Sequence, residues 1–361
     1  MYRAKFFMPG AARLAARLRK VVFALANSRW RACLYCFLAA APIVFVSIQV
    51  AAWVRNIPNW DEFDVVLDFL IALDSGASAP EFVRRLFGMA NEHRMVVSRL
   101  IYALMYGITG GVNFIALAVA GDLFLLGTFA VMLAMVSETA QRLRFAAIFA
   151  LVVFQLQHHE SLFSSCASID HFFVLLPSIA ALGVLTLRSR WSLPLGCGLG
   201  FLATFSLAHG LLVWPIGAGL LWAERRRRDL AAWSMAGGAI LALFSWGFSF
   251  NEGHRLPVWT DSRKVLDYGL TLAGSSPALG NKTIAPWLGL ILVISTAVVL
   301  WRGCQARARL AVATIVWCLG SMAMIAWGRA SMSNDWAPVQ SRYMILSSIA
   351  WALAIWLVVE R

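Results

Sequence analysis

Residues 33–53 read CLYCFLAAAPIVFVSIQVAAW, an apolar run without a charged side chain. An α-helix needs about 20 apolar residues to cross the roughly 30 Å hydrocarbon core of a bilayer. Because unpaired backbone polar groups are too costly in lipid, such a segment crosses as a helix. Comparable apolar stretches follow at 112–136, 145–157, 171–187, 193–208, 210–223, 230–250, 285–301, 310–327 and 344–359. The sequence therefore predicts an all-α, polytopic transmembrane helical bundle of about ten spans, or eleven if 95–111 also crosses.

The overall composition agrees with a membrane protein. Hydrophobic residues make up 60% of the chain and charged residues only 14%, whereas a soluble domain carries about 25% charged residues. A net charge of +13 is also one footprint of nucleic-acid binding. Here, however, the Lys and Arg residues fall in short connectors between apolar segments, where they orient a membrane protein. We therefore expect membrane lipids, and no nucleic acid, among the partners.

The connectors divide into two faces by charge. The basic connectors are 1–32, Arg142 and Arg144, Arg188 and Arg190, Arg225–Arg228, and Arg302, Arg307 and Arg309. By the positive-inside rule this face is cytoplasmic. We predict a multi-pass protein of a bacterial inner membrane, with a basic cytoplasmic N-terminus (1–32) and a single transmembrane domain (33–361). The periplasmic face comprises 54–111, 158–170, 251–284 and 328–343; it holds most of the carboxylates and histidines, so we expect function there.

The first periplasmic loop, 54–111, opens with an acidic motif. It reads NIPNWDEFD and places Asp61, Glu62 and Asp64 just beyond the first span. Close carboxylates raise one another's pKa, and a carboxylate held near an acceptor hydroxyl can act as a general base. The same residues could instead form a solvated loop that caps the following helix. Residues 62–90 are predicted to form amphipathic helices along the outer leaflet.

A second polar motif in this loop precedes the next apolar segment. Asn91, Glu92, His93 and Arg94 combine an amide, a carboxylate, an imidazole and a guanidinium at the predicted membrane surface. Snorkelling to lipid headgroups would explain the last two residues. Four different polar groups in succession indicate a binding role equally well, so all four are candidate substrate-binding residues.

The second and third outer loops add further candidates. His159 and Glu160 lie in HHESLFSSCASIDH, and His254 and Arg255 lie in FNEGHRLPVW. Histidine with carboxylate suits a divalent cation, but adjacent histidines on a helix point about 100° apart. We therefore expect these residues to contact a polar substrate or a neighbouring loop; a divalent cation is possible, and no metal ligand or cofactor is assigned.

The last outer loop carries arginines at the ends of two spans. It reads GRASMSNDWAPVQSRY and contains Arg329, Arg342 and Tyr343. The planar fork of arginine matches the oxygens of a phosphate. The two arginines are placed where a lipid-linked phosphate would lie, although ordinary phospholipid headgroups could also occupy them.

These motifs together resemble a known superfamily. One span, a long outer loop with an acidic motif and surface helices, and then many spans with short connectors is similar to the GT-C membrane glycosyltransferases. More closely, the chain resembles bacterial membrane proteins with WDxxD, HNEHR-like, SxxxGLLxWP and late GR…SRY motifs. Here these motifs read WDEFD (60–64), ANEHR (90–94), SLAHGLLVWP (206–215) and GRASMSNDWAPVQSRY (328–343). Ala90 departs from the pattern, since a histidine usually occupies that position.

The resemblance implies an inverting transfer of a sugar from a polyprenyl-phosphate donor to a glycan or lipid acceptor of the cell envelope. It implies that Asp61 is the base, with Glu62 or Asp64 as alternatives, and that Arg329 and Arg342 hold the carrier phosphate. Residues 92–94 fall where GT-C members place a second polar motif. The shared architecture supports this chemistry by analogy.

Other classes stay open at this point. A transporter or flippase of lipid-linked glycans would carry charged residues near the bilayer midplane, and Asp122 is the one carboxylate well inside a predicted span. An O-antigen polymerase or ligase would share the outer arginines but place its large loop later in the chain. A structural subunit would not depend on the outer acidic residues.

Overall fold

The computed structural model describes residues 29–249, 258–303, 308–330 and 340–360. In these ranges the chain is helical, apart from turns and an isolated bridge between Ala90 and His93. The principal helices are α2 Arg29–Trp53, α3 Asp68–Asp74, α4 Ala79–Leu86, α5 Val96–Thr109, α6 Phe114–Ala134, α7 Thr139–Val153, α8 His159–Phe163, α9 Ser165–Phe173, α10 Leu175–Leu185, α11 Ser192–Thr204, α12 Val213–Ala223, α13 Arg227–Ser245, α14 Ser262–Gly274, α15 Ala285–Arg302, α16 Arg309–Arg329 and α17 Met344–Val359. The short turns that matter below are the π-helix η1 Phe63–Leu67 and the 3-10 turns η2 Leu156–His158, η3 Ala208–Leu212 and η7 Ser341–Tyr343.

Six stretches of the described chain are long and apolar enough to cross a membrane: Trp30–Trp53, Phe114–Ala134, Ser165–Leu185, Ala285–Arg302, Arg309–Arg329 and Ser341–Val359. A seventh crossing results if α7 and the segment Leu156–Phe163, which are bent by 50° at their junction, form one broken span. The all-α, multi-pass membrane class is therefore confirmed. The larger number of expected spans is not reached: α5, α11 and α12 have only 14, 13 and 11 residues. Helix α13, which has 19 residues and covers most of the expected span 230–250, is not among the candidate spans either.

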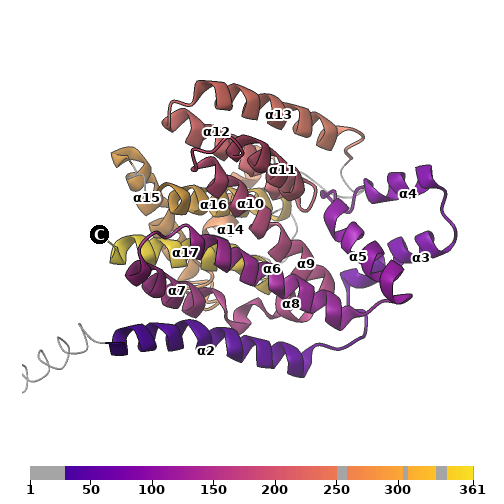
Figure 1. The fold of residues 1–361 in the computed structure, drawn as a ribbon, viewed down its shortest axis with the longest axis horizontal. Coiled ribbons are helices and arrows are strands. Elements are labelled where there is room, and N and C mark those ends of the chain that lie inside the picture. The colour runs from indigo at the N-terminus through magenta and orange to yellow at the C-terminus, as the bar shows by residue number, and fades with distance from the viewer. Residues whose placement is uncertain (1–28, 250–257, 304–307, 331–339, 361) are drawn as a thin grey trace, which may run out of the picture.

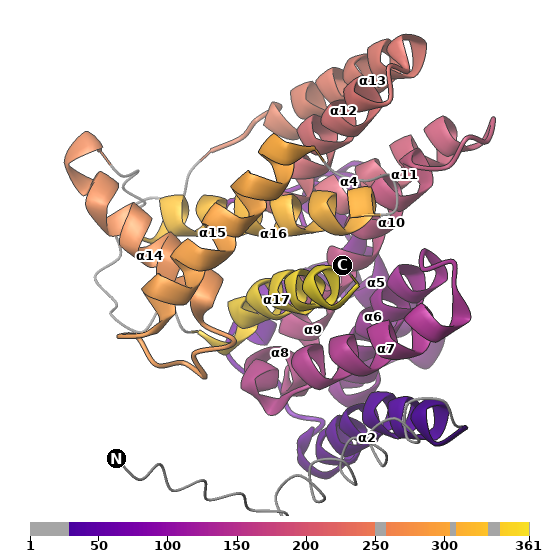
Figure 2. The same ribbon diagram turned by 90° about the vertical axis from the view of Figure 1, so that its left-hand side faces the viewer.

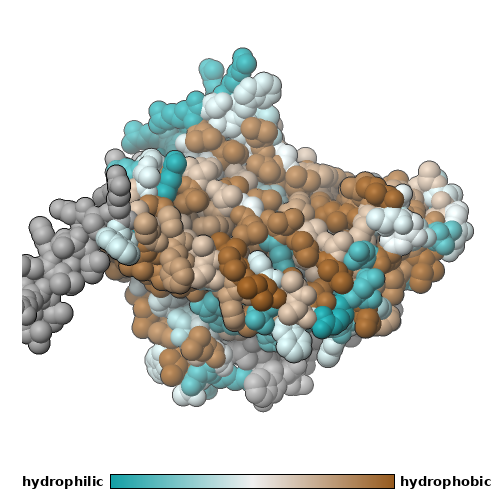
Figure 3. Space-filling view, turned by 60° about the horizontal axis from the view of Figure 1, so that its bottom comes forward, coloured by the Kyte–Doolittle hydropathy of each residue, from teal (hydrophilic) through white to brown (hydrophobic). Residues whose placement is uncertain are grey.

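The long helices form a bundle, with a smaller helical lobe at one end (Figure 1). Helix α2 lies at the periphery and packs on α7, while α3, α4 and α5 make up the lobe. Seen from the left-hand side of Figure 1, α14 and α15 form a pair at one edge and α2 lies at another (Figure 2). Hydrophobic residues run across the middle of the face drawn in Figure 3, and hydrophilic residues gather at its upper edge.

The α14–α15 pair shows how small residues set helix spacing in this bundle. A Cβ atom at Gly274 would lie 1.9 Å from the carbonyl oxygen of Ala285, and one at Gly289 would lie 2.0 Å from that of Leu270. Only glycine permits such a backbone approach, as is common between membrane helices. This pair in turn packs on α16 and α17, whose ends carry the last polar motif.

Charged residues tie the helices together at one end of the bundle. Arg144 pairs with Glu360 at 3.1 Å, beyond the C-terminal end of α17. Arg309 pairs with Glu224 at 2.9 Å, at the start of α16. The residues discussed next lie at the other ends of the same two helices, so the basic connectors and the predicted site are separated along the bundle.

Candidate functional site

The acidic motif and the last polar motif meet in one cavity. Asp61 Oδ2 lies 3.1 Å from Arg342 Nη1, although the two residues are 281 positions apart. The cavity has a volume of about 310 Å³, and Asp64 and Arg329 also line it. The Asp61 carboxylate is 63% exposed, so it can be reached from outside. Two of the predicted groups of site residues, the early acids and the late arginines, are therefore brought together.

Glu62 has a different position from its neighbours. Its side chain is buried, at 2% exposure. Oε1 accepts hydrogen bonds from the Ser165 backbone N–H at 2.6 Å, the Ser165 hydroxyl at 2.7 Å, the Ser164 hydroxyl at 2.9 Å and the Cys166 backbone N–H at 3.2 Å. Oε2 accepts from the Asn59 backbone N–H at 2.7 Å. With both oxygens occupied, Glu62 joins the acidic turn to the N-terminus of α9, where a carboxylate is favoured by the helix dipole.

The turn that presents Asp61 is held in an uncommon backbone conformation. Trp60 has φ 46° and Asn91, which lines the same cavity as Asp61, has φ 51°. A left-handed conformation is rare for residues other than glycine, and for a bulky side chain it marks strain. Glu62 closes this turn by donating its N–H to the Asn59 carbonyl while accepting from the Asn59 N–H. Backbone strain of this kind is concentrated at functional sites.

The second polar motif divides into inward and cavity-facing residues. Arg94 is buried and donates to the carbonyl oxygens of Phe244, at 2.8 Å, and of Phe87 and Trp246. It thus fastens the first loop to the end of α13 and does not line the cavity. Asn91, which is exposed, lines the cavity beside Asp61.

His93 lies between the two parts of the site. Its Nδ1 accepts the backbone N–H of Ala208 at 3.2 Å, so in the neutral ring Nε2 carries the proton and is the donor. Burial, with a smaller contribution from the positive charge of Arg329, lowers the pKa of His93 to about 4, and the charge of Glu92 opposes this shift. His93 is therefore a neutral hydrogen-bond donor at physiological pH.

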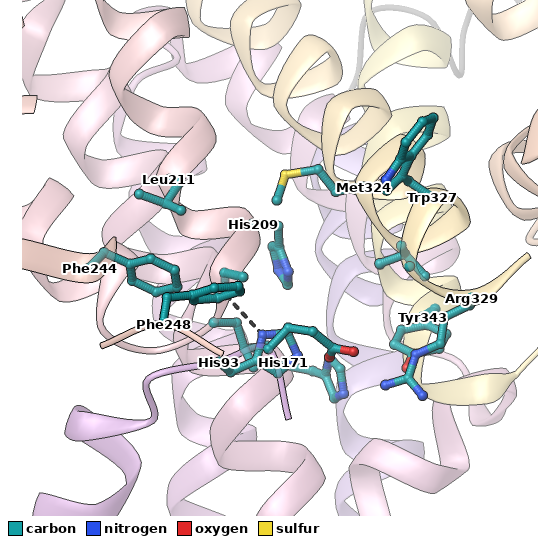
Figure 4. A pocket seen from close by; sticks show the side chains of 15 residues that line it. His93, His171, His209, Leu211, Phe244, Phe248, Met324, Trp327, Arg329 and Tyr343 are labelled. Atoms are coloured by element: carbon teal, nitrogen blue, oxygen red, sulfur yellow. Dashed lines mark hydrogen bonds between the residues drawn. The ribbon is translucent and has the colours of Figure 1, made fainter. Parts of the chain in front are cut away.

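A second cavity, of about 320 Å³ and drawn in Figure 4, adjoins the first. The two share His93, His171, Leu207, Arg329 and Tyr343 as lining residues. In Figure 4, His93, His171, Arg329 and Tyr343 lie in the lower part of the view, and His209 lies between them and Leu211, Met324 and Trp327 above. The remainder of the wall is mainly apolar and comprises Leu211, Phe244, Phe248, Met324, Ile325 and Trp327, with Glu92, Ala208 and Gly328. A polar compartment thus adjoins a hydrophobic one.

Of the remaining predicted site residues, some lie at the cavities and others do not. Glu160 is exposed, and its Oε2 accepts the backbone N–H of Arg342 at 3.2 Å, so it helps to place that arginine. Tyr343 lines both cavities, whereas His159 is exposed and lines neither of them. His254 and Arg255 lie outside the described residues. Among the residues that the structure describes, no three His, Cys, Asp or Glu side chains are grouped so that they could hold a metal ion.

Three further residues of the polar cavity were not among the predicted site residues. Asp68, Arg99 and Asp170 also line it. Asp170 is buried and accepts a hydrogen bond from Ser98 Oγ at 2.5 Å, and Arg99 donates to the carbonyl oxygens of residues 85, 86 and 88. The sequence could have indicated Arg99 and Asp170, because each is a charged residue within or beside an apolar segment, and such residues usually have a partner and a functional role.

Comparison with known protein families, characterised proteins and solved structures finds no match for this chain. The chemistry of the site has therefore to be argued from its geometry.

Proposed function

We propose that this protein transfers a sugar from a polyprenyl-phosphate carrier to a glycan or lipid acceptor, on the non-cytoplasmic side of a bacterial inner membrane. The observation that supports this most strongly is the Asp61–Arg342 pair in a polar cavity that adjoins an apolar one. A phosphate carried on an isoprenoid chain has the same division into a charged head and a hydrophobic tail.

The arginines account for the phosphate end of such a donor. Arg329 and Arg342 line the polar cavity and come from neighbouring span ends. Fixed guanidinium groups near the leaving oxygens stabilise the charge that develops there, often the largest contribution to catalysis. The apolar wall formed by Phe244, Met324 and Trp327 would lie along the first isoprenoid units.

Asp61 accounts for the acceptor end. In the proposed transfer, an acceptor hydroxyl attacks the anomeric carbon of the sugar and the bond from that carbon to the phosphate oxygen breaks. The hydroxyl proton passes to the Asp61 carboxylate, and the electron pair of the broken bond stays on the carrier phosphate. General base catalysis of this type typically contributes 10²–10⁴-fold.

The ion pair between Asp61 and Arg342 would couple donor binding to the release of the base. Before donor binding, the guanidinium neutralises the carboxylate at 3.1 Å. A phosphate entering the cavity competes for the same guanidinium and releases the carboxylate to act as a base. Donor binding therefore favours the state in which the carboxylate is free to act as the base.

The direct test uses polyprenyl phosphate, because it is the carrier common to all such donors. We expect the purified protein in nanodiscs to bind polyprenyl phosphate at least tenfold more tightly than the uncharged polyprenol, and Arg342→Gln to remove this preference. Asp61→Asn should retain binding but lose transfer of labelled sugar in membranes supplied with a panel of polyprenyl-phosphate sugars. Asp74→Asn, in the lobe and outside both cavities, is the matched control. Equal binding of phosphate and alcohol, or full transfer by Asp61→Asn, contradicts the proposal.

The transporter alternative receives less support from the geometry. Asp122 lines a separate groove of about 230 Å³ between α2 and α6. That groove shares no lining residue with the polar cavity, so the carboxylate inside a span does not continue a path from the site.

A further inference from the structure

A basic surface hollow lies at the opposite end of the bundle from the proposed site. It has a volume of about 460 Å³ and follows the turn between α12 and α13. Its wall consists of Leu221, Trp222, Ala223, Arg225, Arg226, Arg227 and Leu230. The hollow combines guanidinium groups with apolar side chains, and no part of the proposed transfer reaction uses it.

The turn itself is rigidly built. Arg225 has φ 58°, a strained value for this residue type. Arg226 is held by Asp229 at 2.7 Å and donates to the carbonyl oxygens of Leu185 and Leu187. These bonds fix the turn against the end of α10, and so against the connector that carries Arg188 and Arg190.

The carboxylates nearest this turn are already engaged. Glu224 is 6% exposed and pairs with Arg309 at 2.9 Å and with Arg226 at 3.6 Å. Asp229 pairs with Arg226. Five arginines around the turn are exposed and form no ion pair within the described part of the chain; we call them the basic patch: Arg188, Arg190, Arg225, Arg227 and Arg228.

The depth of the basic patch matches that of lipid headgroups. The candidate span Ser165–Leu185 ends three residues before Arg188. Trp191 and Trp222 are 57% and 75% exposed, and exposed tryptophans beside a span are typical of the membrane interface. Arginines there meet phosphates, while the apolar wall beside them meets acyl chains.

We infer that the basic patch binds an anionic phospholipid, with the phosphodiester on the arginines of the α12–α13 turn and an acyl chain along Leu221, Trp222 and Leu230. Guanidinium groups suit a phosphate because their donors match two of its oxygens at once. A zwitterionic lipid brings its own ammonium group close to the phosphate and gains less from five unpaired cations. The site is independent of the proposed transfer reaction.

The test uses the full chain in detergent, stripped of lipid and titrated with phosphatidylglycerol or phosphatidylcholine. Retained lipid is counted by native mass spectrometry, and stabilisation is followed as the melting temperature. Each basic residue near an anionic headgroup contributes about fivefold to binding, so the triple substitution Arg225→Gln, Arg227→Gln and Arg228→Gln should weaken phosphatidylglycerol binding by roughly 100-fold. The control removes three exposed cations outside the basic patch: Arg84→Gln, Arg263→Gln and Lys264→Gln; it should bind phosphatidylglycerol as the wild type does.

Three outcomes overturn the inference. The first is equal retention of phosphatidylglycerol and phosphatidylcholine by the wild-type protein. The second is an equal loss of phosphatidylglycerol in the patch and control variants. The third is full stabilisation by glycerol phosphate alone, which would show a site for a soluble anion. If the glutamine variant fails to fold, a salt titration of the wild type replaces it: phosphatidylglycerol retention that does not fall between 0.05 and 0.5 M salt contradicts binding through arginine.

Discussion

The substitution Glu62→Gln tests whether the Glu62 carboxylate holds the acidic turn in place or takes part in the transfer reaction. The substitution keeps the shape of the side chain and removes its charge. In the folded protein Glu62 Oε1 accepts four hydrogen bonds and Oε2 accepts one. A glutamine can place its carbonyl oxygen toward α9, but its amide group then faces the Asn59 N–H, and two donors meet at a spacing of 2.7 Å.

The expected loss follows from these contacts. Hydrogen bonds to a charged group are each worth about 1.5–3 kcal/mol, and a buried donor left without an acceptor costs about 1–3 kcal/mol. The substitution leaves the Asn59 N–H unpaired and weakens four bonds that remain. We therefore expect a loss of about 2–4 kcal/mol, seen as a fall of roughly 3–5 °C in melting temperature.

The assay compares Glu62→Gln with Asp61→Asn. Melting of each purified variant is followed by intrinsic tryptophan fluorescence, and binding of polyprenyl phosphate is measured on the same samples. Asp61 is 63% exposed, so its pair with Arg342 contributes at most about 1 kcal/mol and the melting temperature should hardly change. If Glu62→Gln melts like the wild type, binds the carrier normally and yet transfers no sugar, Glu62 takes part in the chemistry and the positioning role is refuted.

Three further outcomes are expected. Arg94→Lys should lower stability by about 2 kcal/mol or more, because a lysine cannot reach the three carbonyl oxygens that the guanidinium holds; unchanged melting would contradict this clamp. His93 has a folded pKa of about 4 against an ordinary 6.5, so the unfolded chain binds more protons between these values and stability should fall as the pH drops from 6.5 to 4; His93→Gln should flatten that part of a melting-versus-pH profile, and identical profiles would refute the assignment. Gly274→Ala should lower stability by about 1–3 kcal/mol through overpacking against Ala285, whereas Gly238→Ala, where a Cβ meets nothing within 4 Å, should be neutral or slightly stabilising in the same thermal assay.

Much of the fold could be predicted because the bilayer imposes simple rules. The lengths of the apolar runs at 33–53, 310–327 and 344–359 indicated helices, and α2, α16 and α17 cover them. The same rules are less informative for an apolar segment whose helix is too short to cross the bilayer. Residues 193–208 and 210–223 are as apolar as true spans, but α11 and α12 are short because they meet at the 3-10 turn η3.

The site was predicted in part for a related reason. A polar residue in a loop can indicate function, but the sequence does not show whether its side chain faces the cavity or the protein interior. Asp61 and Arg342 were chosen from separate motifs and meet in space. Glu62 and Arg94 belong to the same motifs but face inward, because their partners are donors at residues 164–166 and carbonyls at 244 and 246. Partners more than 100 positions away cannot be read from local spacing.

The Asp61–Arg342 pair also constrains when the protein can act during its biogenesis. At roughly 5–20 residues added per second, the 281 positions between the two side chains correspond to about 14–56 s of synthesis. During that interval Asp61 is already part of the nascent chain while Arg342 has not been made. The polar cavity is completed only when η7 and α17 enter the bundle, so a nascent or prematurely terminated chain can integrate its early helices and still lack an assembled polar cavity.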